Sequence, residues 1–278
     1  MKTIATLAVL IAGIAPLSAA YAQDSQPQEQ ATPDITVSGS VALTSDYRFR
    51  GVSQSDKDMA VQGGLTISHK SGVYVGTWAS NLSGWGTFGG ANMELDLIGG
   101  YKTKLSEHTA LDVGLTWYVY PGGADNSDFA EPYVKLSGNA GRASLTAGVA
   151  YAPRQYALAN VSNAPNSRGQ KQDNLYVWGD GAFAIAGTPL TAKAHLGHSS
   201  GNPGLGPNGT SVTPTGNYWD WSLGMDATWH NLTLNVSYVD TSISHADAAL
   251  LQPNFSKGQD GTGSIADGAV VASLTAAF

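Results

Sequence analysis

The sequence predicts an all-β fold, a transmembrane antiparallel up-and-down β-barrel of about twelve strands. Three observations predict it. Segments of about ten residues alternate apolar and polar side chains, as a strand with one apolar and one polar face does. Short and long connections alternate between those segments, as they do in outer-membrane barrels. Charged residues make up 13% of the chain, whereas a typical soluble domain has about 25%.

The first predicted strand spans residues 34–51. Every second residue from Ile35 is mostly apolar, and this apolar set (the apolar parity) ends with Tyr47 and Phe49. Aromatic residues are enriched where a membrane meets water. The alternate residues form the polar face (the polar parity), which ends with three charged residues: Asp46, Arg48 and Arg50. At about 3.3 Å per residue and a tilt of about 40°, about ten residues cross the hydrocarbon layer of a bilayer. The segment is therefore long enough to span a membrane.

Eleven further strands follow by the same alternation. Their predicted ranges are 60–69, 73–81, 91–101, 109–120, 129–138, 143–151, 175–184, 190–199, 218–229, 232–238 and 267–278. The strand at 218–229 is the clearest, because Trp219 and Trp229 flank an apolar stretch on one face, as two aromatic girdles flank the apolar belt of a barrel. The sequence leaves open which face of 73–81 and of 175–184 points inward.

The connections predict how the barrel lies in a membrane. Those after even-numbered strands are short turns and those after odd-numbered strands are longer, the longest being 153–172, 200–217 and 242–265. Outer-membrane barrels place short turns in the periplasm and long loops outside. An even strand count puts both ends of the barrel on the turn side. Because lipid tolerates no unpaired strand edge, we expect the first and last strands to pair.

The N-terminal region predicts export. Lys2, an apolar run over residues 4–14 and an A-x-A site at residues 20–22 are typical of a secretory signal peptide, so residues 1–22 are predicted to be removed. Residues 23–33 are polar and contain two prolines, and we expect a disordered lead-in there. Residues 34–278 then form the barrel, and the cell outer membrane is the expected location.

Composition excludes several other classes. The chain has no cysteine and a formal net charge of −7, so we expect no disulfide, no thiolate metal site and no nucleic-acid partner. No segment after the signal peptide has the run of about 18 apolar residues that a membrane-spanning helix needs. A soluble β-sandwich or barrel is the alternative fold. It does not explain long strands with aromatic ends or the alternating connections.

The sequence predicts no catalytic site, no metal site and no cofactor. His195, His198 and Ser199 lie close together, but adjacent residues of a strand face opposite sides. Residues 197–201 read G-H-S-S-G, but they lie in a predicted strand and the loop after it, with no strand-to-helix elbow to expose a nucleophilic serine. The segment 125–128 is acidic but lacks the pattern of a calcium-binding loop. We therefore expect a protein that is not an enzyme.

Several motifs are similar to those of a known family. The segment SDYRFRGVSQ at 45–54 resembles a recurrent motif of the TorF-type porins, a family also described as a conserved bacterial protein of unknown function, and weaker matches lie at 72–81, 94–101 and 117–121. The resemblance implies an outer-membrane barrel of a Gram-negative bacterium and assigns no functional residue. Phe278, which ends an alternating strand, resembles the terminal signal that the barrel assembly machinery reads.

If the apolar parity faces lipid, the polar parity lines the lumen. The charged residues predicted to line it are Asp46, Arg48, Arg50, Glu94, Asp96, Asp112, Glu131, Lys135, Lys193, Asp220 and Asp226, together with His195. Acids outnumber fixed bases among them, and charged groups that line a pore set its ion preference. We therefore expect a weak preference for cations. The alternative is that these charges pair across a narrow lumen and plug it.

The function that follows is an outer-membrane porin through which small hydrophilic solutes or ions diffuse passively. Its expected partners are outer-membrane lipid, those solutes and, during insertion, the barrel assembly machinery. The alternative is a closed barrel that binds at the cell surface or supports the envelope through its long extracellular loops. Conductance separates the two, because only an open lumen passes ions.

Overall fold

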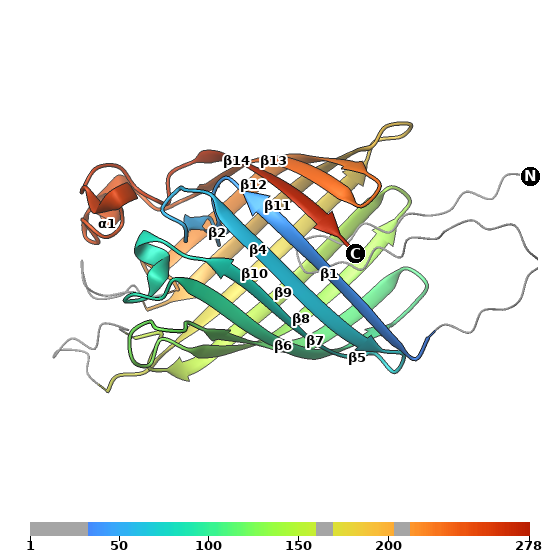
Figure 1. Cartoon of the computed structure of the whole chain (residues 1–278), viewed down its shortest axis with the longest axis horizontal. Helices are drawn as coiled ribbons and strands as arrows, with labels where there is room; N and C mark the ends of the chain where they lie inside the picture. Colours follow the sequence, from blue (N-terminus) through green and yellow to red (C-terminus); the bar gives the residue numbers. More distant parts are fainter. Residues whose placement is uncertain (1–32, 160–168, 203–211) are drawn as a thin grey trace, which may run out of the picture.

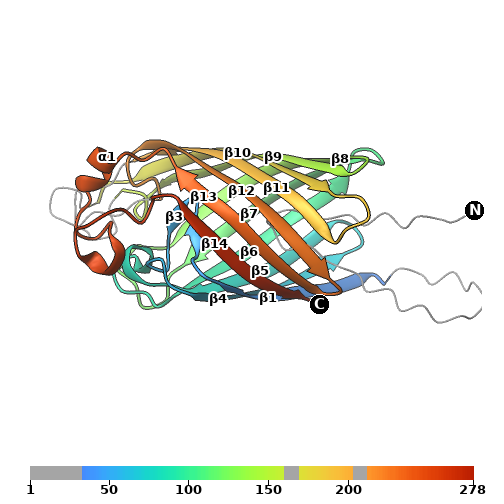
Figure 2. The same ribbon diagram turned by 90° about the horizontal axis from the view of Figure 1, so that it is seen from above.

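The computed structural model describes residues 33–159, 169–202 and 212–278. The predicted signal peptide lies outside these residues, as does the predicted lead-in except for Pro33. In the described part of the chain, twelve strands close into one antiparallel barrel (Figure 1, Figure 2). The barrel strands are β1 (Ile35–Thr44), β4 (Ala60–His69), β5 (Val73–Asn81), β6 (Met93–Lys104), β7 (Thr109–Val119), β8 (Phe129–Ala140), β9 (Ala143–Gln155), β10 (Gln172–Ala184), β11 (Leu190–Gly201), β12 (Asn217–Trp229), β13 (Leu232–Thr241) and β14 (Ala269–Ala277). The predicted fold class is confirmed.

Each barrel strand pairs with its neighbours in sequence, and β1 closes the barrel against β14. The closing register runs from Ser40 opposite Ala277 to Thr44 opposite Ser273. Closure pairs the backbone groups that an open sheet edge would leave exposed. This is the condition for a β-structure to be stable in lipid.

The barrel has two unlike ends (Figure 1). At one, the turn end, the connections are 70–72, 105–108, 141–142, 185–189 and 230–231. At the other, the loop end, they are 45–59, 82–92, 120–128, 156–171, 202–216 and 242–268. The described parts of these loops contain α1 (His245–Ala249) and two single 3₁₀ turns (Gly84–Thr87 and Lys257–Gln259). No helix among the described residues is long and apolar enough to cross a membrane.

The outer wall is apolar. On β1, Val37, Val41 and Leu43 are exposed outward, while Ser40 and Ala42, of the other parity, line a cavity inside the barrel. The structure also settles the two strands whose inward face the sequence left open. On β5, Val73 and Val75 are exposed and Tyr74 points inward, where it bonds Asp112. On β10, Leu175 and Val177 are exposed and Tyr176 is buried.

Exposed aromatic residues gather near both ends of the wall. Toward the loop end these are Trp117, Tyr151 and Trp219, and toward the turn end Tyr101, Phe183 and Trp229. The stretch between them on β12 presents Leu223 and Met225. An apolar belt between two aromatic girdles is the surface that a barrel presents to a bilayer.

The first strand is shorter than predicted. It ends at Thr44, and residues 45–59, which we call the inserted loop, turn back into the interior at the loop end (Figure 1). Tyr47 is buried and Phe49 packs against the buried core, so the prediction that both belong to an outer aromatic belt is wrong. The alternation continues past Thr44 because the inserted loop contains a small hairpin, and a hairpin has the same period of two as a barrel strand.

Candidate functional site: the lumen and its inserted loop

The inserted loop is a compact unit with its own backbone pairing. Strand β2 (Arg48–Phe49) pairs with β3 (Val52–Ser53). The two residues at the tip, Arg50 and Gly51, have φ values of +48° and +79°. A two-residue hairpin of type I′ needs positive φ at both of these positions, which is why a glycine stands at the second.

The base of the inserted loop is held by Asp46. Its carboxylate accepts hydrogen bonds from Arg48 Nε at 2.6 Å and from Ser53 Oγ at 2.6 Å. The Gln54 N–H donates to the Tyr47 carbonyl at 2.7 Å. Asp46 and Arg48 therefore pair with each other inside the loop, and they do not face an open pore as isolated charges.

Arg50, at the tip, reaches across the lumen. Its Nη2 lies 2.6 Å from Glu131 Oε1 on β8, and its Nη1 donates to Asn174 Oδ1 on β10 at 2.6 Å. The guanidinium carbon lies 4.1 Å from the centroid of the Tyr176 ring. Arg50 is 8% exposed and Glu131 is 4% exposed. Since the loop begins at β1 and β8 lies far around the barrel from it, this ion pair bridges opposite walls.

The electrostatics of the inserted loop favour a charged Arg50 and a neutral Tyr47. Burial alone would lower the pKa of Arg50, but the Glu131 carboxylate raises it above its usual value. Burial, followed by the nearby Glu94 and Asp96 carboxylates, raises the pKa of Tyr47 well above its usual value. Tyr47 therefore stays protonated, and its hydroxyl donates a hydrogen bond to Glu94 Oε1 at 2.8 Å.

Apolar side chains pack around the inserted loop at the loop end. One cluster includes Tyr47, Leu82, Phe88, Tyr118 and Phe129. A second joins residues of the inserted loop and barrel to the 242–268 connection, and it includes Val52, Trp85, Tyr218, Phe255 and Ile265. The Ser53 N–H donates to the Ile265 carbonyl at 3.1 Å, and Arg48 Nη1 donates to the Asp267 carbonyl at 3.1 Å. Packed side chains therefore narrow the loop end of the lumen.

The eleven charged residues that the sequence singles out all lie inside the barrel. Three of them, Asp46, Arg48 and Arg50, are on the inserted loop. The other eight lie on the inward faces of strands: Glu94, Asp96, Asp112, Glu131, Lys135, Lys193, Asp220 and Asp226. Most of them pair with an opposite charge, which the sequence could not show.

The pairs on the strand walls lie nearer the turn end than the Arg50–Glu131 bridge. Lys135 Nζ is 3.3 Å from Asp112 Oδ2, and Lys193 Nζ is 3.3 Å from Asp226 Oδ2. His195 lies between two carboxylates, with Nδ1 at 2.7 Å from Asp180 and Nε2 at 3.0 Å from Asp220.

Glu94 and Asp96 differ from the other lumenal acids. Neither has an ion-pair partner among the described residues. Glu94 accepts the hydrogen bond from Tyr47. Asp96 is 8% exposed, and its Oδ1 has no hydrogen-bond partner within the described ranges. These two acids are therefore the lumenal carboxyl groups without a basic side chain beside them in the described part of the chain.

The sequence reasoning missed some charged lumenal residues, among them Asp180 and Lys102. Asp180 lies on β10, whose inward face the alternation did not settle. Lys102 lies on β6 beyond the predicted end of that strand at residue 101. The inward-facing Tyr176 would have identified the face of Asp180, because both belong to the same parity.

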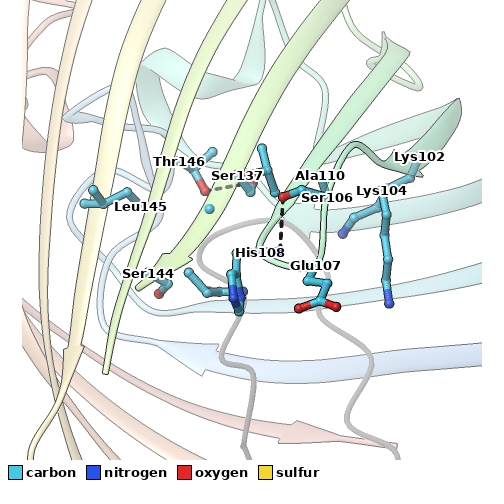
Figure 3. Close-up of a pocket in the computed structure, with 13 residues that line it drawn as sticks. Lys102, Lys104, Ser106, Glu107, His108, Ala110, Ser137, Ser144, Leu145 and Thr146 are labelled. Carbon is cyan, nitrogen blue, oxygen red and sulfur yellow. Dashed lines mark hydrogen bonds between the residues drawn. The ribbon is translucent and has the colours of Figure 1, made fainter. Parts of the chain in front are cut away.

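Among the described residues, polar side chains border two cavities within the barrel. One, of about 140 Å³, lies at the turn end and is bordered by Lys102, Lys104, Glu107 and His108, with Ser137 and Thr146 on its wall (Figure 3). The other, of about 300 Å³, lies against β1, β4, β5 and β6, and its wall includes Ser40, Gln62, Trp78, Asp96 and Thr275. The inner space is thus polar on the turn side of the inserted loop.

The histidine and serine that the sequence brought close do not form a catalytic pair. His198 faces outward and packs against Trp219, with ring centroids 4.6 Å apart. His195 is occupied by Asp180, Asp220 and the Tyr176 hydroxyl. Among the described residues, no group of three or more His, Cys, Asp or Glu side chains is placed to hold a metal ion.

A family match extends over nearly the whole chain. The model of the family described as "Bacterial protein of unknown function (Gcw_chp)" matches residues 28–278. The chain belongs to this family. No curated protein matches the sequence.

Solved structures share the barrel at very low sequence identity. The KdgM porin in complex with disordered oligogalacturonate is 8% identical, with a TM-score of 0.51 over 87% of this chain and 99% of that chain. A chain described under "Unveiling the Mechanism Behind the in-meso Crystallization of Membrane Proteins" is 9% identical, with a TM-score of 0.50 over 87% of this chain and 83% of that chain. An outer membrane channel from Pseudomonas putida F1 is 11% identical, with a TM-score of 0.45 over 92% and 100%.

The likeness to the first two structures concerns the fold. Together with the apolar outer wall and the aromatic girdles, it identifies the chain as a transmembrane β-barrel of the kind found in porins. At such low identity it says nothing about the solute.

Proposed function

We propose that this protein is an outer-membrane channel of a Gram-negative bacterium through which small hydrophilic solutes or ions diffuse passively. The observation that carries the proposal is a closed barrel with an apolar outer wall and charged side chains inside. A barrel of this kind is stable in lipid, and a polar interior supports the passage of water-soluble molecules. The porin fold of the KdgM neighbour supports a channel, and we propose no catalytic role.

The route to the membrane is part of the same proposal. We propose that residues 1–22 are a signal peptide that is cleaved on export, and that the barrel within residues 34–278 has its turn end in the periplasm. The barrel assembly machinery recognises the strand that ends at Phe278. The 45–54 motif supports a TorF-type porin.

The inserted loop makes the channel narrow. Its tip is held to the opposite wall by the buried Arg50–Glu131 ion pair, and the apolar clusters fill the space beside it. Solutes therefore pass through a constriction at the loop end and then enter a wider polar region that contains both cavities. Small solutes and ions are the class that such a path admits.

The eight charged residues on the strand walls line this path, and Arg50 stands at its narrowest point, while Asp46 and Arg48 pair with each other inside the loop. Because most of the acids pair with a base, we assign the weak cation preference to Glu94 and Asp96, which have no such partner in the described part of the chain. Asp112 contributes less, since Lys135 lies beside it.

Vesicle swelling tests the channel directly. Residues 23–278 are refolded into lipid vesicles, which are then moved into isosmotic solutions of glycine or of a large dextran. We expect fast swelling in glycine and none in dextran, because only the smaller solute passes the constriction. No swelling in glycine, from protein shown to be folded and inserted, would contradict a channel.

A closed barrel with a surface-binding role is the second candidate. The observation in its favour is the apolar packing of the inserted loop against the 242–268 connection, which fills the loop end. A variant in which residues 47–54 are replaced by a short Gly-Ser linker separates the two. If the wild-type chain passes no glycine and only this variant does, the native barrel is closed.

A further inference from the structure

The cavity against β1, β4, β5 and β6 has walls that suit a small positively charged organic molecule. Its volume is about 300 Å³, at the lower end of the range for ligand pockets. The wall combines a carboxylate from Asp96, an indole from Trp78, an amide from Gln62 and hydroxyls from Ser40 and Thr275. We infer that this cavity is a binding site for an organic ammonium ion, held between the Asp96 carboxylate and the Trp78 ring.

The state of Asp96 is the first argument. The residue is 92% buried, being 8% exposed, and its Oδ1 has no hydrogen-bond partner in the described residues. No lysine or arginine in those ranges lies within ion-pair distance of it. A buried carboxylate without a counter-charge is unfavourable. A proton or a bound cation relieves that cost, and Asp96 lines the cavity in which a cation would sit.

The position of Trp78 is the second argument. Trp78 on β5 is directly opposite Asp96 on β6 in the strand register, so the two side chains leave neighbouring strands on the same inward face. Both border the cavity. A cation is attracted to the face of an aromatic ring, and tryptophan is the strongest such partner. Carboxylate and indole together therefore select a positive charge that carries apolar surface.

A second acidic residue lies near the cavity, and the inserted loop bounds the cavity on the side of the loop end. Glu94 lies two residues before Asp96 on the same face of β6, and its Oε1 accepts a hydrogen bond from Tyr47 of the inserted loop. The Tyr47 ring packs edge-on against Trp78, with centroids 5.3 Å apart. The site therefore lies directly on the turn side of the inserted loop, where a solute would wait before or after the constriction.

A metal ion fits these walls less well. Divalent cations such as calcium take six or more oxygen ligands. The described residues contain no group of three or more acidic, histidine or cysteine side chains placed to hold a metal. One carboxylate, one amide and an aromatic ring are instead the partners of an alkylammonium group.

This inference assigns a class of solute to the proposed channel, and to that extent it rests on the proposed function. Its test measures equilibrium binding, which can be observed whether or not the barrel conducts. Refolded 23–278 in detergent micelles is titrated with n-butylammonium chloride, with n-butanol and with potassium chloride by calorimetry. We expect saturable binding of butylammonium, none of butanol, and at least tenfold weaker binding of potassium. If butanol or potassium bound as tightly as butylammonium, the proposal of an organic-cation site would be overturned.

Two variants place the binding at these residues. Asp96→Asn is expected to weaken butylammonium binding at least tenfold, and Trp78→Leu at least threefold. The matched controls are Asp260→Asn, in an exposed part of the 242–268 loop, and Trp229→Leu, on the outer wall; both should leave the affinity within twofold of wild type. Unchanged affinity in Asp96→Asn overturns the site. If that variant does not fold, Trp78→Leu decides, and unchanged affinity there overturns it equally.

Discussion

Arg50 is the side chain on which the closure of the loop end most depends. Replacing it with alanine leaves Glu131 buried without its cation, and breaking one partner out of a buried ion pair costs about 3–5 kcal/mol. We expect Arg50→Ala to lower the free energy of unfolding in lipid vesicles by about this amount, measured by urea titration with tryptophan fluorescence. Adding Glu131→Gln should recover part of the loss, because the stranded charge is removed.

Arg142 provides the control for this prediction. It lies exposed in the 141–142 turn at the opposite end of the barrel, where an exposed charge contributes little to stability. Arg142→Ala should therefore change the free energy of unfolding by less than about 0.5 kcal/mol. Equal effects of the two alanine substitutions would mean that Arg50 does not hold the inserted loop in place.

We expect Glu94 and Asp96, the lumenal acids without a basic partner in the described residues, to set the ion preference. Glu94→Gln and Asp96→Asn should each shift the reversal potential in a salt gradient toward zero. Asp112→Asn removes the same formal charge but also leaves Lys135 free of its partner, at a position further from the constriction. We expect a smaller shift from it, and an equal shift in all three variants would show that only net charge matters.

The hairpin of the inserted loop depends on Gly51. Gly51 and Gly141 both have positive φ, where an alanine is strained. A Cβ at Gly51 would also overlap the Thr241 side chain, whereas a Cβ at Gly141 has no atom within 4 Å. Both alanine variants carry the backbone strain of about 1–2 kcal/mol. Only Gly51→Ala also displaces the tip, so we expect a larger conductance from it than from Gly141→Ala. Equal conductances would argue that the tip does not define the constriction.

The strands could be predicted because alternation of apolar and polar residues is a local pattern in the sequence. The inserted loop could not be predicted in this way. Alternation identifies β1 from Ile35 to Thr44, since each outward residue is apolar. It cannot distinguish a barrel strand from a hairpin folded into the lumen, so the first strand was predicted to reach residue 51. The Arg-Gly pair at 50–51 was the available signal, because glycine is favoured in two-residue turns. The partners of Arg50 lie 81 and 124 residues away in the chain, and no local pattern reveals them.

The candidate site was predictable in composition and not in pairing. The polar parity correctly identifies which charges face inward on strands such as β6 and β8. Which acids pair with a basic side chain depends on the register between strands, which places Lys135 opposite Asp112, for example. The unpaired state of Asp96 therefore becomes visible only in three dimensions.

The whole molecule is built to be surrounded by lipid on its outer wall and by water at its ends. Leu223, on β12, is 64% exposed and Leu250, beside α1, is 70% exposed. An arginine at the lipid-facing midplane of a barrel costs about 2–4 kcal/mol, and much less near the interface. Leu223→Arg should therefore lower the free energy of unfolding in vesicles by that amount, while Leu250→Arg has little effect. Equal effects would contradict a lipid-facing wall.

Single-channel recording in planar bilayers tests the central claim, a conducting lumen narrowed by the inserted loop. It compares refolded 23–278 with the variant in which a Gly-Ser linker replaces residues 47–54, both in a potassium chloride gradient. We expect small, stepwise, cation-preferring conductance from the wild-type chain and a conductance several times larger from the variant. No steps from either protein, each shown to be folded and inserted, would contradict a channel; equal steps from both would contradict the constriction.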